Sequence, residues 1–160
     1  MLSRAARFVA ADIPAYNSEI VLLIMAGFIG TAGLALLAPV FAHSGIDLSV
    51  IPAPVLLVGL VWLIPLTGQI GMNPILAVSL LAPLLPAPDL LGVSPEAVVL
   101  ALIGGWALSG ASSPYTATTL LLGAIGGVSA ARVGLIWNGI YTLIGGCLIS
   151  LWVVLVALWG

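Results

Sequence analysis

Long apolar stretches make up most of this chain, and polar residues interrupt them at a few well-separated places. A charged side chain is costly in hydrocarbon, so the stretches without a charge in their interior predict membrane-spanning helices over about 20–42, 95–125 and 133–159. The charged residues lie in the first 19 positions or near the connections between stretches: Arg4, Arg7, Asp12, Glu19, Asp47, Asp89, Glu96 and Arg132.

Two shorter apolar pieces, about 53–66 and 74–86, lie on either side of a polar break over residues 67–73. At about 1.5 Å per residue each piece covers about 20 Å, which is less than the roughly 30 Å of a hydrocarbon core. The lengths therefore predict a re-entrant helical hairpin over 53–86, in which Pro65 ends or bends the first arm. Two complete spans would return the chain to the same side, so the charge pattern is compatible with both arrangements.

The composition extends this pattern to the whole chain. Hydrophobic residues make up 62% of the sequence and charged residues 5%, whereas a soluble domain carries roughly 25% charged residues. We therefore expect an all-α integral membrane protein with a single membrane domain over 1–160, in which residues 1–16 form an interfacial helix. The net charge of -2 gives no sign of a nucleic-acid partner.

The glycines at 27, 30 and 33 share one helical face and predict close packing of a neighbouring helix.

The positions of the arginines predict the orientation of the chain. The positive-inside rule places Arg4, Arg7 and Arg132 on the cytoplasmic side. The acidic connections around Asp47 and Asp89 then lie on the outer side. The chain is therefore expected to be a multi-pass protein of the cell membrane with a cytoplasmic N-terminus and its C-terminus on the outer side.

Two polar breaks share one local pattern, in which a favoured N-cap residue precedes a proline. The pairs are Asn73-Pro74 in the first break and Ser113-Pro114 in the second. Proline is accepted at the first helical position, so each pair is expected to begin a new half-helix. The N-terminus of a half-helix presents unpaired N–H groups and a partial positive charge, which suit an anion.

Oxygen atoms at the same breaks suit an alkali cation, and Na⁺ is the candidate coupling ion. Its expected ligands are carbonyls freed at the end of a half-helix and the hydroxyls of Thr67, Ser112, Ser113 and Thr116. Discontinuous helices that hold an anion and Na⁺ near the midplane recur in secondary transporters. The alternative is a structural kink, in which Ser and Thr satisfy freed backbone groups without any ligand.

Other chemistry finds little support in the sequence. The interiors of the predicted spans contain no ionisable residue of the kind that proton relays use. The single histidine, His43, lies at the end of a span, and no nucleophile–base pair is evident, so we expect no catalytic residue and no enzyme. The single cysteine, Cys147, allows neither a disulfide framework nor a multi-cysteine metal site.

The order of span, hairpin, broken helix and last span resembles the C-terminal half of permeases of the ion transporter superfamily. This group includes divalent-anion/Na⁺ symporters, citrate and C4-dicarboxylate permeases, and arsenite or Na⁺/H⁺ carriers. In that family each of two inverted repeats supplies a hairpin tip and an unwound helix to the site. The resemblance implies that 67–74 form the tip and 112–116 the unwound segment, and that the substrate and ion-binding residues are Thr67, Gly68, Gln69, Gly71, Asn73, Pro74, Ser112, Ser113, Pro114 and Thr116.

The resemblance also implies a function and a partner. It implies ion-coupled secondary transport of a small, carboxylate-like anion across the bilayer by alternating access. The tip lacks the Ser-Asn-Thr triplet of the dicarboxylate symporters, so the resemblance does not name the substrate. The chain supplies one repeat, and the second would lie on another polypeptide, have been lost by truncation, or be a second copy of this chain. The rival interpretation is a non-transporting membrane interaction subunit whose helix breaks are packing devices.

Overall fold

Helices form all the regular secondary structure in residues 17–45 and 47–159, which the computed structural model describes. This confirms the expected all-α class for the described part of the chain. The interfacial helix expected at 1–16 lies outside it. The six longer α-helices are α3 (Asn17–Ser44), α4 (Ala53–Gln69), α5 (Pro74–Leu81), α7 (Pro95–Ser112), α8 (Ala117–Gly126) and α9 (Gly139–Trp159).

Short helical turns join these helices. A 3-10 turn, η3 (Ala82–Leu84), extends α5, and a π-helix, η4 (Arg132–Trp137), precedes α9. The connections between the longer helices contain η2 (Leu48–Val50) and α6 (Pro88–Leu91). The last helix is therefore not continuous over 133–159 as expected, because a π turn and Asn138 separate its start from α9.

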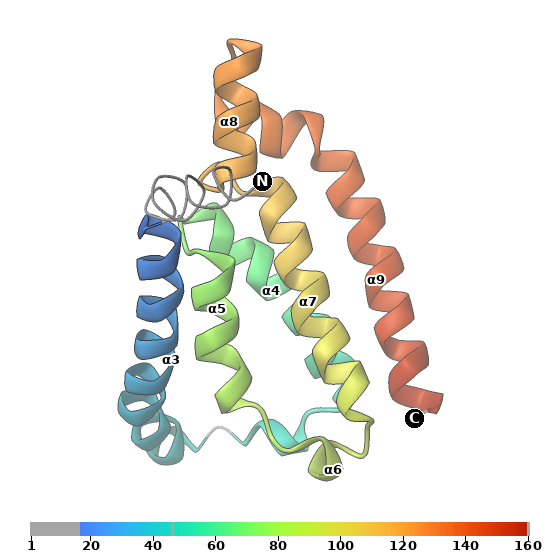
Figure 1. Cartoon of the computed structure of the whole chain (residues 1–160). Helices are drawn as coiled ribbons and strands as arrows, with labels where there is room; N and C mark the ends of the chain where they lie inside the picture. Colours follow the sequence, from blue (N-terminus) through green and yellow to red (C-terminus); the bar gives the residue numbers. More distant parts are fainter. Residues whose placement is uncertain (1–16, 46, 160) are drawn as a thin grey trace, which may run out of the picture.

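Helix α4 lies at the centre of the arrangement and packs against α7 and α9, while α3 packs against α5 (Figure 1). Helices α4 and α5 run in opposite directions and form a hairpin, and its tip lies beside the point where α7 gives way to α8. Helix α8 extends beyond this point, and α9 returns along α7. Leu57 and Val61 of α4, Ala101 of α7 and Val153 of α9 are fully buried where these helices meet.

Pro65 was expected to end or bend the first arm of the hairpin, and of these two outcomes the structure excludes the end. Helix α4 continues through Pro65 to Gln69. A proline removes one backbone donor from a helix, but neighbouring groups can satisfy what it leaves. The side chain of Gln69 donates from Nε2 to the Pro65 carbonyl oxygen at 3.1 Å, which adds a polar contact to this last turn.

Two of the three glycines expected to admit a neighbouring helix lie against α5. A Cβ at Gly30 would lie 2.9 Å from the Cβ of Ser79, and one at Gly33 would overlap the side chain of Leu80. At Gly30 the Ser79 carbonyl oxygen would also lie at 3.0 Å, so a side chain there would push α3 away from α5, whereas at Gly33 the end of the Leu80 side chain would have to turn aside. Gly27 differs, since a Cβ there would meet no atom within 4 Å.

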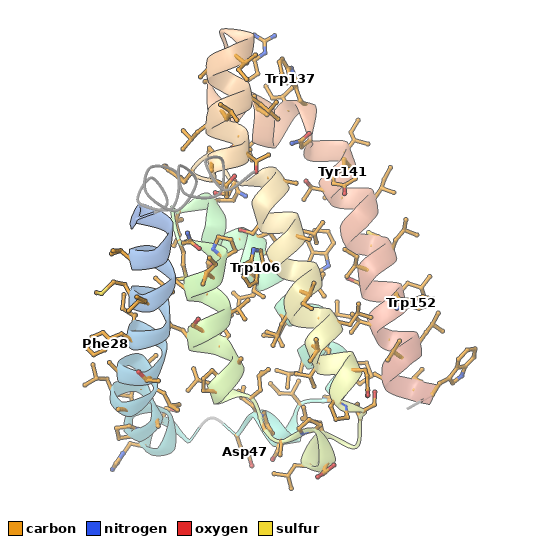
Figure 2. All side chains as sticks on the ribbon, viewed as in Figure 1. Phe28, Asp47, Trp106, Trp137, Tyr141 and Trp152 are labelled. Atoms are coloured by element: carbon orange, nitrogen blue, oxygen red, sulfur yellow. The ribbon has the colours of Figure 1, made fainter. Side chains whose placement is uncertain are left out.

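Large apolar side chains cover much of the outer surface. Figure 2 shows them projecting away from the helices, among them Phe28 on α3 and Trp152 on α9, which are 61% and 59% exposed. Two stretches of the described chain, Pro95–Gly126 and Gly139–Trp159, are long and apolar enough to cross a membrane. A contiguous apolar surface of this kind is rare on a soluble monomer and marks contact with lipid or with another protein.

Candidate functional site

The hairpin tip is a tight turn between α4 and α5. Gly71 adopts a φ of +94°, a conformation that side-chain-bearing residues rarely take. The backbone N–H of Met72 donates to the carbonyl oxygen of Thr67 at 3.1 Å and closes the turn. Asn73 then caps α5, since its side-chain oxygen accepts from the N–H of Ile75 at 2.8 Å and Pro74 occupies the first helical position. The expected half-helix start at Asn73-Pro74 is confirmed.

The break between α7 and α8 differs from the expected one. Ser113-Pro114 does not begin the second half-helix, because α7 ends at Ser112 and α8 begins at Ala117 with Thr116 as its N-cap. A residue before proline is driven out of the helical region, and Ser113 is accordingly extended, with ψ 131°. The chain needs a further turn before it can be helical again.

The two breaks lie against each other. The hydroxyl of Ser113, which is 1% exposed, donates to the carbonyl oxygen of Gly68 at 2.6 Å and accepts from the N–H of Tyr115 at 3.2 Å. A Cβ at Gly68 would overlap the hydroxyl oxygen of Ser109, so this close approach requires glycine. Residues far apart in the sequence thus form one buried polar junction.

Side chains satisfy several carbonyl groups that the break frees from helical bonding. Thr119 donates to the Ser113 carbonyl oxygen at 2.6 Å, and the hydroxyl of Thr116 lies 3.0 Å from the carbonyl oxygen of Gly110. The amide of Asn138 donates to the Ala111 carbonyl oxygen at 2.8 Å and ties the start of α9 to the end of α7. These bonds hold the break in one conformation.

The hydroxyls expected to bind an alkali cation are all engaged with backbone carbonyls. Ser112 donates to Leu108 at 2.7 Å and Thr67 to Ile64 at 2.8 Å, as Ser113 does to Gly68. Their oxygen lone pairs can still face a cation, but the bonds are also those of a structural kink. These hydrogen bonds are therefore compatible both with a cation site and with a structural kink.

A cavity of about 540 Å³, here called the tip cavity, lies beside the hairpin tip. The first residues of two helices line it, Pro74 and Ile75 of α5 and Ala117 and Thr118 of α8. Thr116 makes no capping bond with its side chain, so its hydroxyl does not accept from the N–H groups at the start of α8. None of the described residues that line the tip cavity is charged, and its described polar groups are backbone N–H groups, hydroxyls and the Asn73 amide.

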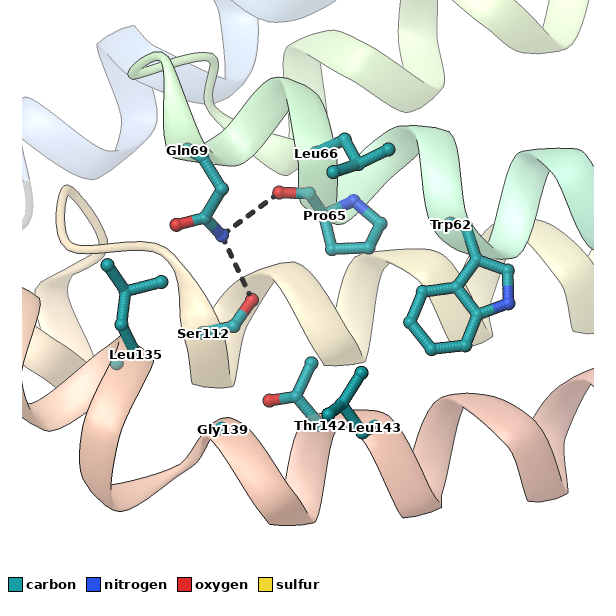
Figure 3. Close-up of a pocket in the computed structure, with 10 residues that line it drawn as sticks. Trp62, Pro65, Leu66, Gln69, Ser112, Leu135, Gly139, Thr142 and Leu143 are labelled. Carbon is teal, nitrogen blue, oxygen red and sulfur yellow. Dashed lines mark hydrogen bonds between the residues drawn. The ribbon is translucent and has the colours of Figure 1, made fainter.

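A second cavity, here called the α9 cavity, has a volume of about 230 Å³ and lies between the last turns of α4, the end of α7 and the start of α9. Figure 3 shows Gln69 and Ser112 on one side of it and Thr142 on the other. The nitrogen of Gln69 donates to the Ser112 hydroxyl at 3.3 Å. The lining is otherwise mostly apolar, with Trp62 at one end.

The structure divides the sequence-predicted residues between these two cavities. Gln69 and Ser112 line the α9 cavity, whereas Thr67, Gly68 and Pro114 line neither. The tip cavity receives Gly71, Asn73, Pro74, Ser113 and Thr116.

The polar residues that hold or line these sites and were not predicted include Thr118, which lines the tip cavity. Asn138 and Thr119 bond the broken end of α7, and Thr142 lines the α9 cavity. A signal was present for Asn138, since an amide side chain within a long apolar run needs a partner. Threonines in such runs carry a weaker signal, because they can bond their own helix.

No protein-family model, no curated protein and no solved structure matches this chain. The likeness of the element order to half of a permease therefore stays a prediction. The chemistry of the two cavities must be argued from their own residues.

Proposed function

We propose that this chain is a multi-pass membrane protein that forms one half of an ion-coupled secondary transporter for a small, carboxylate-like anion. The observation that carries the proposal is the meeting of two helix N-termini in the tip cavity. Helix N-termini attract anions through free N–H groups and a partial positive charge. At the start of α5, Pro74 has no N–H and Asn73 accepts from the N–H of Ile75, so α5 contributes its partial charge and the free N–H groups are those at the start of α8. Thr116 and Thr118 add hydroxyls beside these ends, and none of the lining residues that the structure describes is acidic.

The helix lengths support a re-entrant hairpin. Helix α4 has 17 residues and α5 has 8, which correspond to about 26 Å and 12 Å, both below the roughly 30 Å of a hydrocarbon core. The hairpin tip reaches only the level of the break between α7 and α8, while α8 continues beyond it (Figure 1). In this proposal the tip stops within the membrane, the N-terminus and Arg132 face the cytoplasm, and the C-terminus faces outward.

The bond from Ser113 to Gly68 suggests which parts move during transport. Because it joins the hairpin tip to the broken helix inside one chain, both would move as a rigid unit. Alternating access then requires a second repeat that moves against this unit and closes the other side of the tip cavity. The exposed apolar side chains of α8, such as Leu121 and Ile125, offer a surface for that partner or for lipid. Na⁺ is the candidate coupling ion.

Uptake measurements test the proposed function. Membrane vesicles from the source cells contain the natural partner, and we expect Na⁺-dependent uptake of at least one radiolabelled probe among succinate, citrate and lactate. Asn73→Ala and Ser113→Ala should lower that uptake about tenfold or more, because each removes a group that shapes the tip cavity. Ser94→Ala is the matched control, since Ser94 makes no capping bond.

The outcome of these measurements also decides against the rival interpretation. A structural subunit would leave the uptake of all three probes unchanged when Asn73 or Ser113 is replaced while the chain remains in the membrane. Immunoblots of the vesicles check that each variant is inserted in equal amount. The bonds that Thr67 and Ser112 donate to backbone carbonyls are compatible with this rival as well as with a cation site.

Cysteine labelling tests the hairpin. Cys147 is exposed and is first replaced by alanine. Ile70, at the tip, is 82% exposed, and we expect Ile70→Cys to react from the outer side or from a cavity and not freely from the cytoplasm. Leu90→Cys, in the connection expected outside, is the control. Free cytoplasmic labelling at position 70 would replace the hairpin with two ordinary spans.

A further inference from the structure

We propose that the tip cavity selects a monocarboxylate that carries an aromatic ring, and that the side-chain amide of Asn73 holds its carboxylate. This inference rests on the proposed function, in which the tip cavity receives the anion, and it names the class of substrate. It is carried by the unpartnered N–H groups of Asn73 and by two aromatic side chains in the lining, Trp106 and Tyr115.

The cap bond fixes the orientation of the Asn73 amide. The N–H of Ile75 can only donate, so the atom of Asn73 that lies 2.8 Å from it must be the side-chain oxygen. The amide nitrogen points elsewhere, and neither of its two N–H groups has a partner within the described chain. Asn73 is exposed and lines the tip cavity, so these two donors are open to a ligand.

Helix α8 supplies donors to the same cavity. Its first N–H groups receive no capping bond from Thr116, and the exposed Thr118 adds a hydroxyl. A carboxylate accepts through two oxygen atoms, so donors from two helices suit it. The starts of α5 and α8 each carry a partial charge of about half an elementary charge, and together they balance about one negative charge. None of the described lining residues carries a full positive charge that would balance a second carboxylate.

The rest of the lining is mostly apolar and partly aromatic. Trp106 lies on α7 six residues before its end at Ser112, which is about 9 Å along the helix. Figure 2 shows Trp106 on the side of α7 toward α5, where Ile75 lines the same cavity. Trp106 is 40% and Tyr115 62% exposed, so their flat faces are open to a ring. A second carboxylate here would lose hydration without gaining an ion pair.

The volume of the tip cavity, about 540 Å³, leaves room for a ring beside the carboxylate. An apolar cavity of roughly 150 Å³ holds one benzene ring in another protein. An aromatic monocarboxylate therefore fits the size of the cavity, its limited positive charge and its aromatic wall.

Propionate and 3-phenylpropionate are matched probes, because both are monocarboxylates and only the second carries a ring. Equilibrium binding of the radiolabelled acids is measured on vesicles from the source cells without any ion gradient, and binding by vesicles that lack this chain is subtracted. We expect saturable binding of both acids, about tenfold tighter for 3-phenylpropionate, because its ring moves apolar surface out of water. Equal affinity for the two acids, or no binding that requires the chain, would overturn the proposal.

Two variants locate the carboxylate and the ring. Asn73→Asp keeps an oxygen that can cap α5 but replaces the two N–H donors with a negative charge, so it should abolish binding of both acids. Trp106→Ala should weaken 3-phenylpropionate about tenfold and leave propionate unchanged, whereas Trp152→Ala on α9 should change neither. Unchanged binding by Asn73→Asp would overturn the role of the amide. This variant keeps the test decisive if Trp106→Ala disturbs the fold.

Uptake separates this inference from the proposed function. Na⁺-dependent uptake of succinate, together with equal binding of propionate and 3-phenylpropionate, would support anion transport and overturn the inference. The expected binding without Na⁺-dependent uptake of any probe would overturn transport and leave the anion site and its specificity standing.

Discussion

Removing the hydroxyl of Ser113 should destabilise the chain by about 2 kcal/mol. The substitution Ser113→Ala deletes the donor to Gly68 and the acceptor for the N–H of Tyr115. The Gly68 carbonyl keeps a second donor, the N–H of Gly71 at 3.2 Å, so it is not left unpaired. The Tyr115 N–H loses the partner that Ser113 supplied. One lost hydrogen bond costs roughly 1 kcal/mol and an unpaired buried donor roughly 1–3 kcal/mol. Because Tyr115 is 62% exposed, the total lies near the lower end.

The free energy of unfolding can be measured by titrating the detergent-solubilised chain with sodium dodecyl sulfate and following the loss of helical circular dichroism. Ser94→Ala serves as the reference because Ser94 makes no capping bond, and surface changes of this kind stay within about 0.5 kcal/mol. The comparison requires that both variants unfold in a single reversible step. If Ser113→Ala loses no more stability than Ser94→Ala, the hairpin tip is not bonded to the broken helix and the buried junction is wrong.

Two further changes test other parts of the structure. Gly134→Ala should cost about 1–3 kcal/mol in the same titration, because its Cβ would overlap the carbonyl oxygen of Ser112, whereas Gly59→Ala lies in open space and should be neutral or stabilising by up to about 1 kcal/mol. The Ser49 hydroxyl and N–H hold the pKa of Asp47 below its usual value. That stabilisation of the turn is present above about pH 4 and is lost as the pH falls through the lowered pKa. In carboxyl-carbon NMR, Ser49→Ala should raise this pKa; an unchanged value would contradict the contact.

The sequence predicted best those features that depend on a few neighbouring residues. Asn73 and Pro74 begin α5 as expected, because the cap bond reaches only to Ile75 and the proline fixes its own backbone. Polar residues and prolines also placed the connection near Asp89. The break expected at 67–73 is shorter in the structure, because α4 continues to Gln69 and only residues 70–73 separate it from α5. The long uncharged stretches predicted where the long helices lie. The bounds of these helices depend on composition over many positions.

At Ser113-Pro114 the rule that an N-cap residue before a proline begins a helix failed, because a contact with a distant part of the chain decides what the Ser113 side chain does. Its hydroxyl bonds Gly68 on the hairpin and does not cap the next helix, which begins after Thr116. The sequence also did not predict that Gln69 and Asn73 line different cavities. Gln69 still belongs to the last turn of α4 and faces α9, whereas Asn73 faces the tip cavity. Which side of the hairpin each residue faces depends on how α4, α7 and α9 pack.

The contact between Ser113 and Gly68 also constrains the order in which the chain can fold during synthesis, because it joins residues 45 positions apart. At roughly 5–20 residues per second, the ribosome needs about 2–9 s to add the second residue after the first. During that interval the hairpin has no partner from the broken helix. A nascent chain stalled before position 113 should therefore leave its tip open to protease, and one stalled well beyond α8 should protect it. Insertion of this hairpin is then completed only late in translation.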